Sequence, residues 1–271
     1  MNAPERLLLP DVQSQVDRRN LPIDGVGVRG VRYPLQVASG TSIVSTIATL
    51  AMTVALPAAV KGTHMSRFIE ILEAQRAPLD RRGFVALAQR MLERLQAASG
   101  MVEMQFPYFL RKTAPVSRVS SLLDADVLWR VRVDADGGYE FDMRIVAAAT
   151  SLCPCSKEIS AYGAHNQRSH ISIEARIDGE MEIEELVSIA ERNASCEVYG
   201  LLKRPDEKYV TEHAYENAKF VEDLVRDVAL ALEQDVRVRA YIVEAENFES
   251  IHNHSAIARI VGPRAHPPQD A

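Results

Sequence analysis

The chain has 271 residues, enough for one large domain or two small ones, and a hydrophobic content of 47% that can supply a sizeable core. A net charge of −6 argues against a nucleic-acid groove, and no run approaches the roughly 20 apolar residues of a membrane helix. Three cysteines do not make a disulfide framework and the N-terminus lacks a secretory pattern, so we expect a cytoplasmic protein without nucleic-acid or membrane partners.

The first half of the chain predicts two strands, two helices and two further strands. Alternating apolar and polar residues, or valines among glycines, predict strands at about 25–37, 43–56, 101–113 and 117–134. Phe68 and Leu72 indicate a helix that Ser66 can cap. Apolar residues at helical spacing over 84–95 indicate a second helix, which Gly100 ends. The first two strands are expected to form a hairpin.

The second half repeats this order of elements without repeating the sequence. Alternation predicts four more strands, at about 139–150, 171–177, 235–246 and 254–262. Helical spacing predicts helices around 183–190 and 220–232, and we interpret residues 194–214 as a polar, irregular segment.

This double pattern predicts an α+β protein with two ββααββ modules, in which antiparallel sheets carry helices on one face. Because the other face must also be covered, a homo-oligomer that closes the sheets into a barrel is a plausible assembly. The expected divisions are an N-terminal arm, a first module, a second module with the metal site and a disordered tail, at 1–20, 21–135, 136–262 and 263–271.

Residues 151–168 gather thiol, imidazole, amide and cationic groups between two predicted strands. Cys153 and Cys155 are separated by one residue, which is closer than in structural zinc pairs, and Cys196 is the only other cysteine. A closed four-cysteine site is therefore excluded, and an open site with about three protein ligands remains. We interpret Cys153 and His165 as ligands in preference to a buried thiol and a structural histidine.

A third ligand must come from another segment. The polar residues 197–213 offer three candidates that spacing alone does not rank, which are Asp206, Glu207 and His213. Glu249 and His252 fit acid–base or orienting groups about as well as they fit ordinary loop residues. A basic cluster at the start of the first predicted helix can bind an anion such as phosphate, and it consists of Lys61, His64 and Arg67.

Five motifs, in this order, strongly resemble the type IB GTP cyclohydrolases. They are Lys61–Phe68, Ser151–Ser160 with Gly163–Arg168, Glu197–Lys208, Phe220–Arg226 and Asn247–His254. The match covers roughly residues 20–262 and shows no departure at a motif position. The resemblance implies the tunnelling fold, in which ββααββ modules associate into a barrel around a tunnel, and a homotetramer with active sites at subunit interfaces.

The resemblance further implies hydrolysis of GTP to 7,8-dihydroneopterin triphosphate and formate, the first step of tetrahydrofolate biosynthesis. It implies one divalent metal per site, with Cys153, His165 and Glu207 as the ligands. This mixed sulfur, nitrogen and oxygen set suits Mn²⁺, Zn²⁺ or Fe²⁺ and does not choose among them. Cys155 has no assigned role, and a bridge to Cys153 across one residue would be strained.

For the mechanism, we expect a water made acidic by the metal to attack C8 of guanine while a nearby histidine protonates the opening ring. Glu222 resembles the acid that anchors the purine in this fold, and it would accept hydrogen bonds from guanine N–H groups. Glu249 and His252 are the candidates for acid–base or orienting work. The cations available for the triphosphate are Lys61, His64, Arg67, Arg168, Lys203 and Arg204.

Two alternatives stay open at the level of sequence. A related tunnelling-fold enzyme would give a cyclic-phosphate dihydroneopterin or, as in a nitrile reductase of this fold, use a cysteine covalently. A non-enzymatic, metal-dependent oligomer would use the cysteine cluster only for structure.

Overall fold

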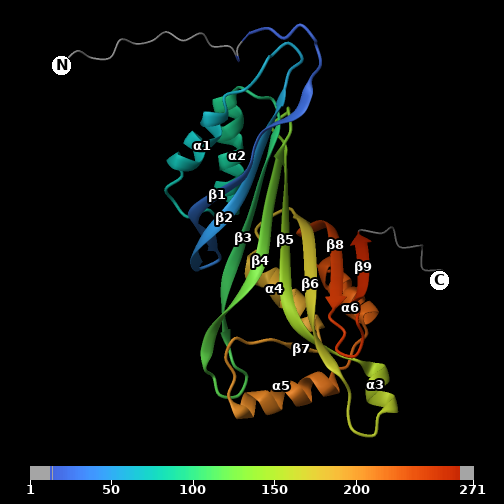
Figure 1. The fold of residues 1–271 in the computed structure, drawn as a ribbon. Coiled ribbons are helices and arrows are strands. Elements are labelled where there is room, and N and C mark those ends of the chain that lie inside the picture. The colour runs from blue at the N-terminus through green and yellow to red at the C-terminus, as the bar shows by residue number, and fades with distance from the viewer. Residues whose placement is uncertain (1–12, 14, 263–271) are drawn as a thin grey trace.

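A computed structural model describes residue 13 and residues 15–262, which form one antiparallel sheet backed by helices (Figure 1). The strands are β1 (Ile23–Ser39), β2 (Ser42–Leu56), β3 (Gly100–Thr113), β4 (Ser120–Val133), β5 (Tyr139–Leu152), β6 (Asn166–Ile177), β7 (Cys196–Glu197), β8 (Val238–Asn247) and β9 (Ala256–Gly262). The helices are α1 (Met65–Ala74), α2 (Arg81–Leu95), α3 (Pro154–Ile159), α4 (Ile183–Asn193), α5 (Arg204–Glu216) and α6 (Val221–Glu233).

The sheet is continuous across both halves of the chain. Its strand order is β1-β2-β3-β4-β5-β6-β8-β9, and the short β7 pairs with β5. The halves are joined where β4 pairs with β5, from Val133 opposite Tyr139 to Asp126 opposite Val146. Helices α1 and α2 lie against the first half and α4 and α6 against the second, whereas α3 and α5 lie at the end of the sheet far from α1 (Figure 1).

The apolar side chains of each strand point beneath the helices because successive side chains alternate between the two faces. On β5, Phe141, Met143 and Ile145 are buried in the common core. Phe84 of α2 packs on Phe141 and on Trp129 of β4, with ring centroids 6.4 and 5.7 Å apart. This aromatic cluster fixes α2 over the junction of the two halves.

The opposite face of the sheet carries a ladder of charges. Arg130 pairs with Glu103 and with Glu174, each at 2.9 Å, and Arg132 pairs with Asp142 at 2.7 Å. Neighbouring antiparallel strands place these residues side by side, so opposite charges stabilise the pairing. The polar parity seen in the sequence therefore forms this face, as expected for a sheet with helices on one side.

All eight predicted strands and all four predicted helices are present. The hairpin of β1 and β2 is confirmed by a ladder that extends from Ile23–Leu56 to Ser39–Ser42. β6 begins at Asn166, several residues earlier than predicted. Its start was missed because the buried side chains of its first four residues are polar, so they show no apolar alternation. Gln167 and Ser169 are these buried residues, and both form hydrogen bonds.

Three local predictions were wrong. Residues 194–214 are not irregular throughout, because β7 and α5 lie there; α5 buries few residues, so it shows no apolar stripe. Ser66 is not the cap of α1, since the helix begins after His64 and Ser66 lies inside it. Gly100 does not end α2, which stops at Leu95 with Gln96 in the left-handed conformation, and Gly100 begins β3.

The described part of the expected N-terminal arm is attached to the segment before α1. Asp17 donates its backbone N–H to the Ala59 carbonyl at 2.9 Å, and Val16 forms an isolated bridge with Val60. Residues 1–12 and 14, and the expected disordered tail at 263–271, lie outside the described residues. Among the residues that are described, no helix is long and apolar enough to cross a membrane.

Candidate functional site

Cys153 and His165 lie opposite each other where the β5–β6 ladder ends. The backbone N–H of Cys153 donates to the His165 carbonyl at 3.2 Å, one step beyond the pair of Leu152 and Asn166. Ser156 links the same two residues, because its hydroxyl donates to the Cys153 carbonyl at 3.1 Å and accepts from the His165 N–H at 3.2 Å. The structure therefore brings these two predicted ligands together, and both are half-buried.

The Cys153 thiol has no role in holding α3. Cys153 is the residue before this six-residue helix, and its side chain forms no capping hydrogen bond. Pro154 starts the helix, as proline does where no N–H is needed. The sulfur is thus free for other chemistry, whereas Cys155, one residue on, is exposed.

Gln167 fixes the imidazole of His165. Its amide nitrogen donates to Glu249 Oε1 at 3.4 Å, and its Oε1 lies 2.9 Å from His165 Nδ1. A carboxylate and an amide oxygen only accept, so this order of contacts places the histidine proton on Nδ1. Nε2 then keeps its lone pair, as in metal-binding histidines whose other nitrogen donates to a neighbour.

A buried polar network lies next to this site at the ends of three neighbouring strands. The Ser169 hydroxyl donates to Asn247 Oδ1 at 2.7 Å, and Ser151 Oγ lies 2.6 Å from Ser169 Oγ. All three side chains are buried, and each belongs to a different strand. Each of the three side chains has a hydrogen-bond partner on a neighbouring strand. The network therefore holds the ends of β5, β6 and β8 in register.

Helix α6 begins beside Cys153. Lys219 donates its backbone N–H to the Leu152 carbonyl at 3.2 Å, and the Asn217 side chain donates to the Ala194 and Ser195 carbonyls. Glu222 lies in the first turn of α6 and is exposed, as predicted for an acid at a helix N-terminus.

Glu207 lies away from Cys153 and His165 within the same chain. Glu207 lies in the first turn of α5, whereas the contact between α5 and α3 is near the other end, where Lys157 Nζ donates to the Tyr215 carbonyl at 2.6 Å. Tyr215 is eight positions after Glu207 along the helix, which is about 12 Å of axial rise. Among the described residues, no group of three or more His, Cys, Asp or Glu side chains could hold a metal ion.

Asp206 and His213, the other two candidates for the third ligand, have different surroundings. Asp206 is fully buried, and its oxygens accept from Val116 N, Ser117 N, Ser117 Oγ and Lys203 N at 2.5–2.9 Å. Burial alone would raise the pKa of this carboxyl, but these hydrogen bonds outweigh burial and hold the pKa well below its usual range. His213 stacks on Tyr209 along the exposed side of α5.

The loop after β8 brings only part of its predicted group to His165. Glu249 reaches it through Gln167, and Ser250 Oγ lies 3.3 Å from His165 Nδ1. His252 is exposed and stacks on His254, with ring centroids 5.1 Å apart. Arg168 is an exposed residue of β6, and its carbonyl accepts from the Phe248 N–H at 3.0 Å.

The basic cluster of Lys61, His64 and Arg67 lies at the opposite end of the sheet, where α1 begins (Figure 1). Lys61 Nζ donates to Gln15 Oε1 at 3.0 Å, while His64 and Arg67 line a cavity of about 290 Å³. Within one chain, these cations are not next to Cys153 and His165.

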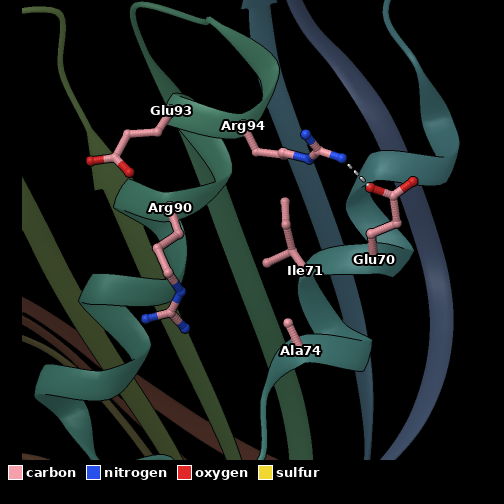
Figure 2. Close-up of a pocket in the computed structure, with 6 residues that line it drawn as sticks. All are labelled: Glu70, Ile71, Ala74, Arg90, Glu93 and Arg94. Atoms are coloured by element: carbon pink, nitrogen blue, oxygen red, sulfur yellow. Dashed lines mark hydrogen bonds and ion pairs between the residues drawn. The ribbon is translucent and has the colours of Figure 1, made fainter.

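A larger hollow of about 530 Å³ lies between α1 and α2 (Figure 2). Arg94 of α2 crosses it to pair with Glu70 of α1 at 2.7 Å, and Arg90 and Glu93 of α2 also line it. None of the predicted site residues lines this hollow. Volume alone therefore does not mark the functional site.

Sequence reasoning missed a partly buried cluster around Lys112 of β3. Its Nζ pairs with Glu191 of α4 at 2.7 Å and with Glu197 of β7, and it lies over the Tyr199 ring. Burial raises the pKa of Glu191, although Lys112 opposes this shift. A lysine in a strand carries no local signal that it meets two carboxylates from distant segments.

This chain is similar to known proteins over almost its whole length. A family model described as type I GTP cyclohydrolase folE2 matches residues 9–258. GTP cyclohydrolase FolE2 1 of Dechloromonas aromatica is 59% identical over 97% of this chain and 99% of its own length. GTP cyclohydrolase FolE2 2 of Cupriavidus metallidurans is 57% identical over 96% of this chain and 97% of its own.

Among solved structures, uricase from Arthrobacter globiformis aligns with a TM-score of 0.51 and 9% identity, covering 90% of this chain and 96% of that one. At this identity the likeness shows the fold alone, which is the α+β tunnelling fold. The predicted fold class is confirmed.

Proposed function

Because the chain belongs to the type I GTP cyclohydrolase FolE2 family, we propose that it hydrolyses GTP to 7,8-dihydroneopterin triphosphate and formate in folate biosynthesis. The observation that carries this proposal is the full-length match together with the paired Cys153 and His165 at the end of the β5–β6 ladder. The cyclic-phosphate enzyme and the non-enzymatic oligomer gain no support from the relatives.

A divalent metal is the proposed cofactor, held by Cys153, His165 and Glu207, with Mn²⁺, Zn²⁺ and Fe²⁺ as candidates. The free thiol and the free Nε2 lone pair fit such an ion. When bound, the metal supplies Lewis-acid activation of a water molecule. Since Glu207 lies at the far end of α5 in the same chain, we propose that a second copy of the chain supplies it.

The proposed assembly is a homotetramer with each active site shared between subunits. Two incomplete groups support this arrangement: Cys153, His165 and the start of α6 at one position, and Glu207 with the start of α5 at another. All three cysteines are free thiols, which supports a reducing, cytoplasmic setting.

The residues around His165 have separate proposed tasks. Glu222 accepts hydrogen bonds from guanine N–H groups and so discriminates against adenine, which presents a different donor pattern. Glu249 orients His165 through Gln167. His252, on the exposed part of the same loop, is the candidate for donating a proton to the purine ring as it opens.

The test is product analysis with purified protein and GTP, before and after chelation and after adding back each metal. Equimolar formate and 7,8-dihydroneopterin triphosphate are expected, with loss on chelation and recovery with metal. A cyclic-phosphate product, or no formate in any metal-loaded sample, would refute the proposal.

A further inference from the structure

We propose that Arg118, together with Lys203 and Arg204, binds the triphosphate of the substrate on a rigid platform built from the β3–β4 turn and residues 197–207. This inference rests on the proposed function, and it adds a binding residue from a segment outside the five family motifs. Three features support it: the platform is held rigidly, Arg118 has an unusual backbone conformation, and the three cations have no carboxylate partner among the described residues.

Asp206 joins the two segments of the platform. The carboxylate accepts from Val116 N and Ser117 N at 2.9 and 2.8 Å in the β3–β4 turn, and from Lys203 N at 2.8 Å before α5. Arg118 follows Ser117, and Arg204 follows Lys203. One buried carboxylate thus holds the backbones of both cation-bearing segments side by side.

A second clamp fixes the other end of residues 197–207. Glu197 is held by Lys112, which also pairs with Glu191 at 2.7 Å. Between the two clamps, Gly200 lies against β4 so closely that a Cβ would stand 2.6 Å from the Leu122 carbonyl oxygen. The segment that carries Lys203 is therefore fixed on both sides.

Arg118 has an unusual backbone for its residue type. Its φ is +61°, in the left-handed region of the backbone map. Residues other than glycine, asparagine and aspartate rarely adopt this conformation. Ser117, bound through its N–H and hydroxyl to Asp206, holds this conformation in place. Such conformations persist where the surroundings fix them, and they cluster at ligand sites.

The three cations have no carboxylate partner among the residues that the structure describes. All three side chains are exposed. Their neighbours Lys112 and Lys208, by contrast, form ion pairs within the chain. In a protein of net charge −6, three adjacent unpaired cations on a rigid platform form a concentrated positive site.

A polyphosphate fits this site better than a single carboxylate. Arginine presents a planar fork that binds phosphate oxygens in pairs, and three cations balance most of the charge of a triphosphate. Glu207 lies one residue after Asp206, so the platform also carries the proposed third metal ligand. The triphosphate would then lie on the chain that donates Glu207, and the guanine on the chain that donates Glu222.

Calorimetry with two probes tests the assignment on the full-length protein as purified. Inorganic tripolyphosphate presents the phosphates without the base, and guanosine presents the base without phosphates. Arg118→Gly is the main variant, because glycine adopts a positive φ readily and removes only the side chain. We expect tripolyphosphate binding to weaken at least tenfold and guanosine binding to stay unchanged, with partial recovery in Arg118→Lys.

Arg76→Ala, at an exposed arginine between α1 and α2, is the charge-matched control and should bind both probes as wild type does. Metal chelation by tripolyphosphate contributes equally to both proteins and cancels in the comparison. Unchanged tripolyphosphate binding in Arg118→Gly, or an equal loss of guanosine binding, would overturn the proposal. Formate release by wild type is measured separately, so failure of the proposed function is distinguished from failure of this site.

Discussion

The contact between Gln167 and His165 offers the sharpest test of how the site is oriented. Gln167→Leu removes the acceptor that lies 2.9 Å from His165 Nδ1, and it also removes the donor to Glu249. Leucine has a similar volume and suits the buried position. The substitution therefore removes the orienting bond without opening a cavity.

The expected cost appears in metal affinity and activity more than in stability. Loss of a group that orients a metal-binding histidine costs roughly 10- to 100-fold in affinity or activity. This corresponds to about 1.4–2.7 kcal/mol. His165 and Glu249 are only half-buried and can form hydrogen bonds with water, so the free energy of unfolding should change by less than about 1.5 kcal/mol.

The assay is a titration of metal-free protein with Mn²⁺ or Zn²⁺, accompanied by formate release and thermal melting. Ser250→Ala is the matched control, because Ser250 is exposed and its hydroxyl is the more distant neighbour of Nδ1, at 3.3 Å. It should cost no more than a few-fold. Wild-type metal affinity in Gln167→Leu would refute the orienting role, as would an equal loss in both variants.

Three further outcomes are expected. Glu222→Gln should raise KM for GTP about tenfold or more. Because Glu222 is exposed, the melting temperature should not change. An unchanged KM would contradict the proposed binding of guanine by Glu222. The folded-state pKa of Asp206 is lowered, so its stabilisation is fully present above roughly pH 4 and lost as pH falls; Asp206→Asn should flatten the acid part of a melting-temperature profile. Burial, then the Glu197 charge, raises the pKa of the Cys196 thiol to about 11, so alkylation should modify Cys155 first and Cys196 only after unfolding, as mass spectrometry would show.

Sequence was sufficient for elements with a strong period. The alternation that predicted β5 and β6 arises because one face of the sheet packs under helices, and the same pairing brings Cys153 and His165 opposite each other. Helix α5 was missed because it buries few residues and shows no apolar stripe. Its start is fixed by Asp206 through contacts to the distant β3–β4 turn, which no local pattern reveals.

The same limit applied to individual site residues. Asp206 and Glu207 were equivalent as candidate ligands by spacing, yet adjacent positions on a helix point in different directions. Asp206 is buried with all its hydrogen bonds made within the chain, whereas Glu207 is exposed. The distance from Glu207 to His165 depends on the direction in which α5 runs, and sequence does not determine that direction.

Mixing two inactive variants is the most direct test of whether the active site is divided between two subunits. Cys153→Ala and Glu207→Gln are each expected to abolish formate release, because each removes a proposed metal ligand from a different part of the site. When the two variants are dissociated, mixed in equal amounts and reassembled, random pairing should place two intact parts together at about a quarter of the sites. Recovery of about a quarter of wild-type activity is the predicted result. No recovery from mixed oligomers in which both variants are present would show that Cys153 and Glu207 act within one chain.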